Sequence, residues 1–110
     1  MSLDFYLTYE EDGNKIEVFS INITHNLGET AEKAGIYECL WRPDENNFIY
    51  AKDIIEVLEK GLIDLKARPD YFKQFDAPNG WGLYIHFVPF VEEVLNACKQ
   101  YPNAKISVSR

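Results

Sequence analysis

The sequence predicts an α+β fold in which a small antiparallel sheet, an N-terminal hairpin plus a C-terminal strand, is covered by three to four helices. Apolar and polar residues alternate near both ends of the chain, over residues 3 to 9 and 104 to 109. This is the period of a half-buried strand. Between them, two long segments repeat apolar residues at helical spacing, and 110 residues with 46% apolar content suffice for a single domain over residues 1 to 110.

The N-terminal region predicts the hairpin. Residues 3 to 9 place leucine and aromatic side chains on one face, and Asp12-Gly13-Asn14 supplies turn residues that tolerate positive φ. Residues 15 to 23 then resume a strand pattern. Within it the apolar residues change parity between Val18 and Phe19, so we expect a β-bulge near Val18 to Ser20.

A short helix is expected after the hairpin. Asn26 and Glu29 have the spacing of a capping box, which predicts a helix that begins at Leu27. Gly35 can end this helix in a left-handed conformation. Residues 36 to 41 then form a second short apolar piece, either helical or extended.

The middle of the chain predicts a loop followed by the most regular helix. Residues 42 to 49 are polar and contain a proline, which is typical of a loop. From residue 51 to 67 the apolar residues repeat at helical spacing, and Pro69 enforces an end. Residues 70 to 75 add one aromatic turn.

The last helix contains a proline that needs an explanation. After a loop over residues 76 to 82, apolar residues at helical spacing form a stripe from 83 to 98. Pro89 fits this helix if its regular part begins near Ile85 or His86, because the first four amides of a helix have no intrahelical acceptor. The C-terminal strand then pairs with the hairpin.

Composition narrows the classes of function. The chain has 18 acidic and 11 basic residues, a formal net charge of −7, and no cluster of Lys and Arg. Because nonspecific nucleic-acid binding relies on such clusters, we do not expect a nucleic-acid partner. There is no run of 18 or more apolar residues and no N-terminal secretion signal, so we expect no membrane span and a cytoplasmic location.

Metal and cofactor sites are not expected. Cys39 and Cys98 lie in apolar surroundings, where a buried thiol acts as a small hydrophobe, and we expect both to be reduced. Together with His25 and His86 they include no pair at the spacing of about two to four residues that local metal ligands show. No acidic loop resembles a calcium site. We therefore expect no metal and no cofactor.

The strand-to-helix junction carries the first candidate site residues. Histidine titrates near neutrality, so His25 could act as a general base or contact a ligand. The alternative is a structural histidine that bonds a backbone carbonyl. A base would need a partner such as Asp4, Tyr6 or Tyr37, which the sequence does not place. The neighbouring Asn26 is either a helix cap or a ligand contact.

Two further segments carry tryptophan. In Trp41-Arg42-Pro43 the indole beside a guanidinium suits stacking on a planar ring or gripping an anion, and the alternative is a core tryptophan with a surface arginine. Asn79-Gly80-Trp81-Gly82 lacks the lysine of a phosphate loop and reads as a lid or contact surface. We hypothesise that six residues converge on one concave ligand-binding site at the end of the sheet. They are His25, Asn26, Trp41, Arg42, Asn79 and Trp81.

The same segments carry a resemblance. With N-I-T-H-N-L at 22 to 27, A-G-I-Y at 34 to 37, L-W-R-P at 40 to 43 and N-G-W-G at 79 to 82, most of the chain resembles a group of small uncharacterised proteins encoded in bacteriophages and prophages. Where members carry Met or Trp after the T-H-N core, this sequence has Thr30 and Ala31. The resemblance implies a setting, a phage-type accessory protein in the host cytoplasm, rather than a mechanism.

Two classes of function follow from these features. The first is a binding module that takes up a small polar ligand, such as a nucleotide-derived immune signal, or blocks a host protein and so inhibits host defence. The second is a small hydrolase-like or transferase-like enzyme with His25 as general base. No second catalytic group is evident, so the sequence favours binding. An interaction protein that acts through a flat apolar patch, or as a homo-oligomer, is a third alternative.

Overall fold

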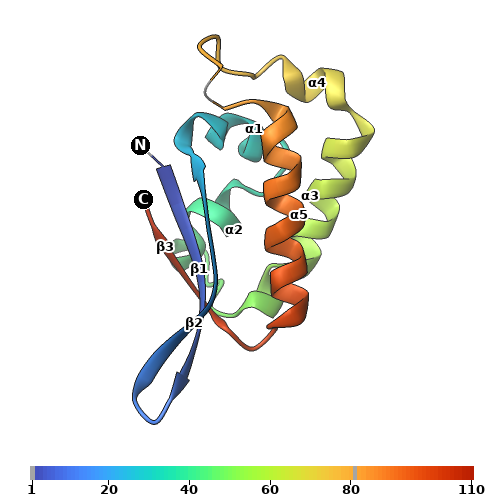
Figure 1. The fold of residues 1–110 in the computed structure, drawn as a ribbon. Coiled ribbons are helices and arrows are strands. Elements are labelled where there is room, and N and C mark those ends of the chain that lie inside the picture. Colours follow the sequence, from blue (N-terminus) through green and yellow to red (C-terminus); the bar gives the residue numbers. More distant parts are fainter. Residues whose placement is uncertain (1, 81) are drawn as a thin grey trace.

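A three-stranded antiparallel sheet and five α-helices form the fold, in the computed structural model that describes residues 2–80 and 82–110 (Figure 1). The α+β class expected from the sequence is confirmed. The elements are β1 (Ser2–Glu11), β2 (Asn14–Thr24), α1 (Gly28–Lys33), α2 (Tyr37–Trp41), α3 (Ile55–Ala67), α4 (Pro69–Lys73), α5 (Tyr84–Gln100) and β3 (Lys105–Ser109). The helix beyond the three to four expected is α4, which corresponds to the single turn expected over residues 70 to 75.

The first strand is the centre of the sheet, because β1 pairs with β2 on one side and with β3 on the other. Leu7 pairs with Phe19 and the next residue of β1 pairs with Glu17, so Val18 is an extra residue in β2. This confirms the expected bulge. Residues directly opposite in an antiparallel pair point to the same face. The bulge therefore places Phe19 and Ile16 on the same face as Leu7.

All helices lie on one side of the sheet (Figure 1). Leu3, Phe5 and Leu7 of β1 are fully buried beneath them, as the alternation of residues 3 to 9 predicts. Helix α5 crosses this face beside β2, and α3 packs against α5. The tip of the β1–β2 hairpin extends beyond the helices, whereas the ends of β1 and β3 next to the two termini lie side by side (Figure 1). That shared end of the sheet is where the pocket described below opens.

The expected capping box at Asn26 is not how the helical segment begins. Thr24 caps a 3-10 turn over His25–Leu27, because its hydroxyl accepts a hydrogen bond of 3.3 Å from the Asn26 amide. Helix α1 begins only at Gly28. Its N-cap residue is Leu27, whose side chain makes no capping hydrogen bond. The end of α1 is as expected, since Gly35 has a φ of 76°. The tight turn at Thr24 holds the side chains of the next two residues at the end of β2.

Two prolines act differently from the expectation. Pro69 does not merely end α3; it occupies the first turn of α4, where its missing amide costs no hydrogen bond. Helix α5 begins at Tyr84, slightly earlier than expected, so Pro89 lies inside its hydrogen-bonded part. Its ring and the side chain of Ile85, one turn before, are both exposed. The lost bond therefore falls on the solvent side of α5.

The remaining segments agree more closely with what the sequence predicts. The apolar piece expected over residues 36 to 41 is helical rather than extended, and its last five residues form α2. The loop after α2 contains a 3-10 turn at Pro43–Glu45, and a second such turn, Ala51–Asp53, precedes α3. Within the described ranges, no helix has the length and apolar character needed to span a membrane.

Candidate functional site

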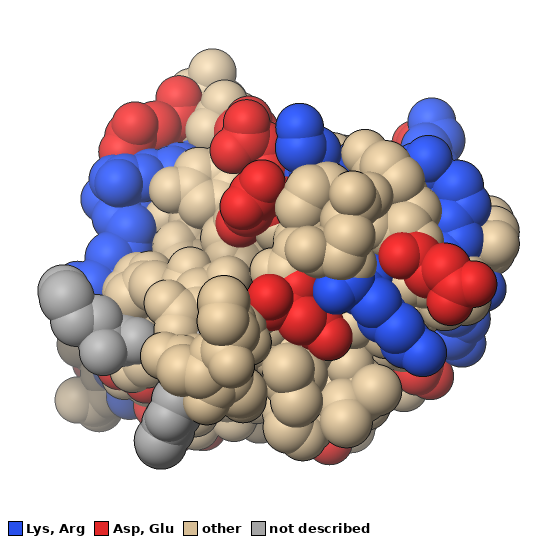
Figure 2. Space-filling view, turned by 90° about the horizontal axis from the view of Figure 1, so that it is seen from above, with Lys and Arg blue, Asp and Glu red and all other residues tan. Residues whose placement is uncertain are grey.

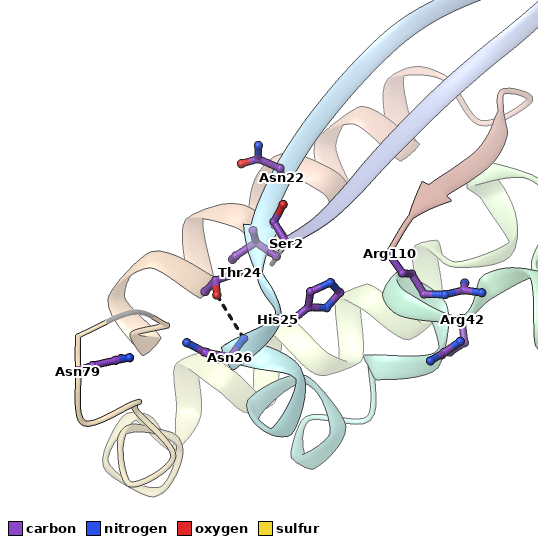
Figure 3. Close-up of a pocket in the computed structure, with 9 residues that line it drawn as sticks. Ser2, Asn22, Thr24, His25, Asn26, Arg42, Asn79 and Arg110 are labelled. Carbon is purple, nitrogen blue, oxygen red and sulfur yellow. Dashed lines mark hydrogen bonds between the residues drawn. The ribbon is translucent and has the colours of Figure 1, made fainter.

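A surface pocket of about 970 Å³ opens at the end of the sheet where β2 passes into the 3-10 turn (Figure 3). Its walls come from four parts of the chain that are distant in sequence: the start of β1, the end of β2, the segment after α2, and the C-terminal residue. The loop before α5 adds a fifth wall. The lining residues are Ser2, Asn22, Ile23, Thr24, His25, Asn26, Arg42, Asn79 and Arg110.

Four of the six residues expected to share a site do line this pocket. They are His25, Asn26, Arg42 and Asn79. Trp41 does not line it, because its side chain is buried beneath it and only 2% exposed. Trp81 lies outside the described residues. The polar members of the expected set are thus brought together, whereas Trp41 belongs to the core.

His25 is held by the indole of Trp41. The indole Nε1–H donates a hydrogen bond of 2.9 Å to Nδ1 of the imidazole. An indole nitrogen can only donate, so Nδ1 must present a lone pair, and the proton of the neutral ring lies on Nε2. Nε2 is buried and has no hydrogen-bond partner among the described residues. Neither alternative weighed for His25 from sequence, a bond to a backbone carbonyl or a free base, included this side-chain partner.

Trp41 is itself fixed by its neighbours. Its ring stacks on that of Tyr37 with centroids 5.5 Å apart and an interplanar angle of 13°. Helix α2 supplies both rings, and the spacing of four residues places them on one face. The Trp41 carbonyl accepts a hydrogen bond of 2.9 Å from Nη1 of Arg110. The core tryptophan therefore supports both His25 and Arg110 from below.

Two arginines form one side of the pocket. Nη1 of Arg42 donates to Glu45 at 3.1 Å, and Nη1 of Arg110 donates to Asp44 at 3.0 Å. Nη2 of Arg110 also lies 3.7 Å from the Glu45 carboxylate. The hydrogen bond from Arg110 lowers the pKa of Asp44 below its ordinary value, so this acid stays ionised. Each guanidinium has five N–H donors, and these bonds use only some of them.

Arg110 was not among the residues expected at the site. It follows a strand whose pattern indicates only pairing with the hairpin, and nothing in its local sequence singles it out. The antiparallel pairing of β3 with β1 brings the end of the chain beside the start of β1. Ser2 and Asn22 reach the pocket through strand pairing as well. Ser2 of β1 pairs with Thr24 of β2, and Asn22 lies two residues before Thr24 on the same strand.

The loop over residues 76 to 82 closes against the junction. The amide of Tyr84 donates to the Asp76 carboxylate at 2.8 Å, and the amide of Ala77 donates to the Gly82 carbonyl at 3.3 Å. Gly82 has a φ of 111°, and a Cβ built there would lie 2.7 Å from Cβ of Asn26. Only glycine therefore allows this approach. The close contact holds the loop that carries Asn79 at the rim of the pocket.

The charge of the pocket differs from that of the whole chain. The formal net charge of the protein is −7, yet the described lining residues include two arginines and neither Asp nor Glu. On the face seen from above, acidic and basic side chains are interspersed, without a continuous patch of either sign (Figure 2). The described part of the chain contains no group of three or more His, Cys, Asp or Glu placed to hold a metal ion. The chemistry on offer is hydrogen bonding to a polar or anionic group.

The chain was compared with protein-family models, with curated proteins and with solved structures, and none of the three comparisons finds a match.

Proposed function

We propose that this protein is a binding module that takes up a small anionic, polar ligand in the pocket at the end of the sheet. The observation that carries the proposal is the charge contrast: Arg42 and Arg110 line the pocket and no Asp or Glu is among its described lining residues, in a chain of net charge −7. Guanidinium groups bind phosphate and carboxylate through directed N–H donors. A pocket of about 970 Å³ also lies within the range that holds a drug-sized or nucleotide-sized ligand.

The two sides of the pocket support different parts of such a ligand. Figure 3 shows Arg42 and Arg110 on one side and Asn26 and Asn79 on the other, with His25 between them. The arginines offer donors only and suit an anionic group. A carboxamide offers both donors and an acceptor and suits the polar edge of a base or a sugar. A phosphate-bearing nucleotide or nucleotide-derived signal has both parts, so it is the ligand class we propose.

Catalysis by His25 is the weaker alternative. A general base needs an unprotonated nitrogen directed at the substrate. Nδ1 of His25 is engaged by Trp41, and Nε2 carries the proton in the neutral ring. Tyr37, one of the partners considered from sequence, stacks on Trp41 instead. These contacts favour a histidine that donates a hydrogen bond over one that accepts a proton.

The phage-type setting implied by the resemblance extends this proposal. We propose that the ligand is met in the host cytoplasm, where taking up a nucleotide-derived signal would inhibit a host defence. The segments that carry the resemblance at positions 22 to 27 and 40 to 43 include six residues that line the pocket: Asn22, Ile23, Thr24, His25, Asn26 and Arg42. Blocking a host protein through the same surface is the other outcome that the experiment below can reveal.

Isothermal titration calorimetry against a defined panel tests the proposal. The panel is pyrophosphate, AMP, ADP, cyclic AMP and a cyclic dinucleotide, with adenosine as the ligand without phosphate. We expect at least one phosphate-bearing member to bind, adenosine to bind at least about tenfold more weakly, and Arg42→Gln or Arg110→Gln to weaken binding about tenfold, because a hydrogen bond to a charged group is worth about 1.5 to 3 kcal/mol.

Arg68→Gln is the matched control. Arg68 also forms an ion pair on the surface, at 2.7 Å from Asp64, but it lies between α3 and α4 and does not line the pocket. Its substitution removes the same charge and should leave the affinity unchanged. Equal losses in all three variants would indicate a general charge effect. Absence of binding across the panel, or equal affinity for adenosine, would contradict the proposal.

A further inference from the structure

The imidazole of His25 has one feature that the rest of the pocket does not explain. Its Nε2 is buried and has no partner among the described residues, whereas Nδ1 is fixed by Trp41 at 2.9 Å. A buried donor without an acceptor destabilises the folded state, so native proteins rarely leave one unless a ligand or ordered water completes it. Nε2 belongs to a residue that lines the pocket, which makes a bound ligand the natural source of the missing acceptor.

From this we infer that Trp41 is a positioning residue, which holds His25 so that its Nε2–H donates to an acceptor of the bound ligand beside the two arginines. This inference deepens the proposed function and rests on it. Figure 3 shows the His25 ring turned toward the side on which Arg42 and Arg110 lie. That side would then offer N–H donors from three side chains. Such a wall selects the anionic, acceptor-rich end of the ligand, such as a phosphate group.

The indole is suited to this task for a specific reason. Histidine can carry its single proton on either nitrogen, and the hydrogen bond made by one nitrogen decides the state of the other. A hydroxyl or amide partner could adapt to both tautomers, but an indole N–H can only donate. Because Trp41 is stacked on Tyr37 and buried, it cannot turn away. The proton is therefore fixed on Nε2 before any ligand arrives.

The first test needs no ligand. In the full chain labelled with ¹⁵N, a hydrogen bond between Trp41 Nε1–H and His25 Nδ1 should give a measurable ¹⁵N–¹⁵N coupling between these two nitrogens. The ring nitrogen Nε2 should show a directly bonded proton that exchanges slowly. Trp41→Phe should remove the coupling and speed this exchange. A wild-type spectrum without the coupling, or with the ring proton on Nδ1, would overturn the positioning role.

The second test separates positioning from packing by a double-mutant cycle with pyrophosphate as probe. We expect His25→Ala to weaken pyrophosphate binding about tenfold and Trp41→Phe to weaken it several-fold. In the His25→Ala background, Trp41→Phe should cause no further loss. Equal losses from Trp41→Phe in both backgrounds would show that Trp41 acts through packing alone, and unchanged affinity in His25→Ala would remove His25 from the ligand contacts.

Control measurements keep the two proposals distinguishable. The Phe side chain in Trp41→Phe leaves part of the indole volume empty and can lower stability. The midpoint of thermal unfolding is therefore measured for each variant, and affinities are compared only at temperatures below that midpoint. If wild-type protein binds neither pyrophosphate nor the nucleotides, the proposed function fails and the ligand contact of His25 fails with it. If it binds them with unchanged affinity in both single variants, the proposed function stands and this inference is overturned.

Discussion

Gly82 is the residue at which the pocket depends most directly on a missing side chain. A Cβ at this position would lie 2.7 Å from Asn26 Cβ and 3.3 Å from the Asn26 carbonyl carbon, and the φ of 111° is unfavourable for other residues. We expect Gly82→Ala to lower the free energy of unfolding by about 2 to 3 kcal/mol. It should also shift the backbone resonances of Thr24 and Asn26, because the loop must move away.

Gly80→Ala is the control for this change. Gly80 also has positive φ, 78°, but a Cβ there meets no atom within 4 Å. Gly80→Ala should lower the free energy of unfolding by about 1 to 2 kcal/mol, because alanine is unfavourable in the left-handed conformation. It should leave the resonances of Thr24 and Asn26 unchanged. Chemical denaturation and a backbone NMR spectrum measure both effects. Equal losses of stability, with no shift at Asn26 in either variant, would show that Gly82 makes no close contact.

Thr30 offers a test of the burial of polar groups. Its side chain is fully buried in α1, and its hydroxyl has no hydrogen-bond partner among the described residues. Thr30→Val replaces the hydroxyl by a methyl group of similar size, so we expect the free energy of unfolding to rise by about 1 kcal/mol. Thr30→Ser keeps the hydroxyl and loses the methyl group, and it should destabilise. A loss of stability in Thr30→Val would mean that the hydroxyl is bonded.

At the residue scale, the sequence indicated which polar residues gather but not what holds them. His25, Asn26, Arg42 and Asn79 could be expected together because they follow strand or helix ends. The Trp41–His25 hydrogen bond joins residues 16 positions apart, and no local pattern reports such a contact. Arg110 reaches the pocket only through the pairing of β3 with β1. Long-range contacts of this kind are set by tertiary packing rather than by local propensity.

At the scale of elements, helix α5 carries a proline at an internal position. Its missing amide leaves the Ile85 carbonyl without the usual partner, and proline is about 3 kcal/mol less favourable than alanine in a helix interior. Alanine also raises the entropy of the unfolded chain, which offsets up to about 1 kcal/mol. We therefore expect Pro89→Ala to raise the free energy of unfolding by about 1 to 2 kcal/mol, measured by urea denaturation.

Pro69 provides the comparison within the same chain. It lies at the start of α4, where an amide would have no intrahelical acceptor, so Pro69→Ala should not stabilise the protein. A gain in Pro69→Ala as large as that in Pro89→Ala would contradict this reading of the two positions. No gain at position 89 would show that the helix already compensates for its proline.

The elements themselves were largely predictable, and the differences have local causes. Period-two alternation and the change of parity gave β1, β2 and the bulge, because each strand buries only one face. The start of α1 was expected from a capping box at Asn26, but Thr24 forms a 3-10 turn instead, which competes for the same amides. Pro89 was expected on the correct helix but nearer its start, and Pro69 was expected only to end α3, whereas it also begins α4. Element boundaries depend on packing as much as on residue type.

At the scale of the whole molecule, the state of the two cysteines reports on global unfolding. Cys39 and Cys98 are both free and buried. Burial raises the pKa of the Cys98 thiol to about 12. The pKa of the Cys39 thiol is also raised, mainly by burial and to a smaller extent by the nearby Cys98. The thiolate is the reactive form, so both thiols should be almost unreactive at pH 8 in the folded state.

Alkylation with iodoacetamide at pH 8, followed by mass spectrometry, measures this protection. We expect both thiols to react together, and only at denaturant concentrations that unfold the protein, since they share one core with the strands and helices. The unfolded chain in denaturant is the control for full reactivity. Rapid reaction of one cysteine under native conditions would show a local opening of α2 or α5.

The charge of the pocket is also a property of the whole molecule, because it is assembled from both ends of the chain and three segments between them. Its two arginines are held by Asp44 and Glu45, which do not line it. Attraction between exposed charges is screened by salt over a distance of about 8 Å at physiological ionic strength. Binding of an anion here should therefore weaken as salt is raised, which distinguishes it from uptake of a neutral ligand.

The most direct measurement of the central claim is an NMR titration of the full chain with pyrophosphate that follows side-chain and backbone signals together. We expect saturable shifts of the guanidinium signals of Arg42 and Arg110 and of the His25 ring, with smaller shifts at Asn26 and Asn79, and no shift at Arg68. Saturable shifts confined to other surfaces, or none at millimolar pyrophosphate, would contradict an anion-binding pocket at this end of the sheet.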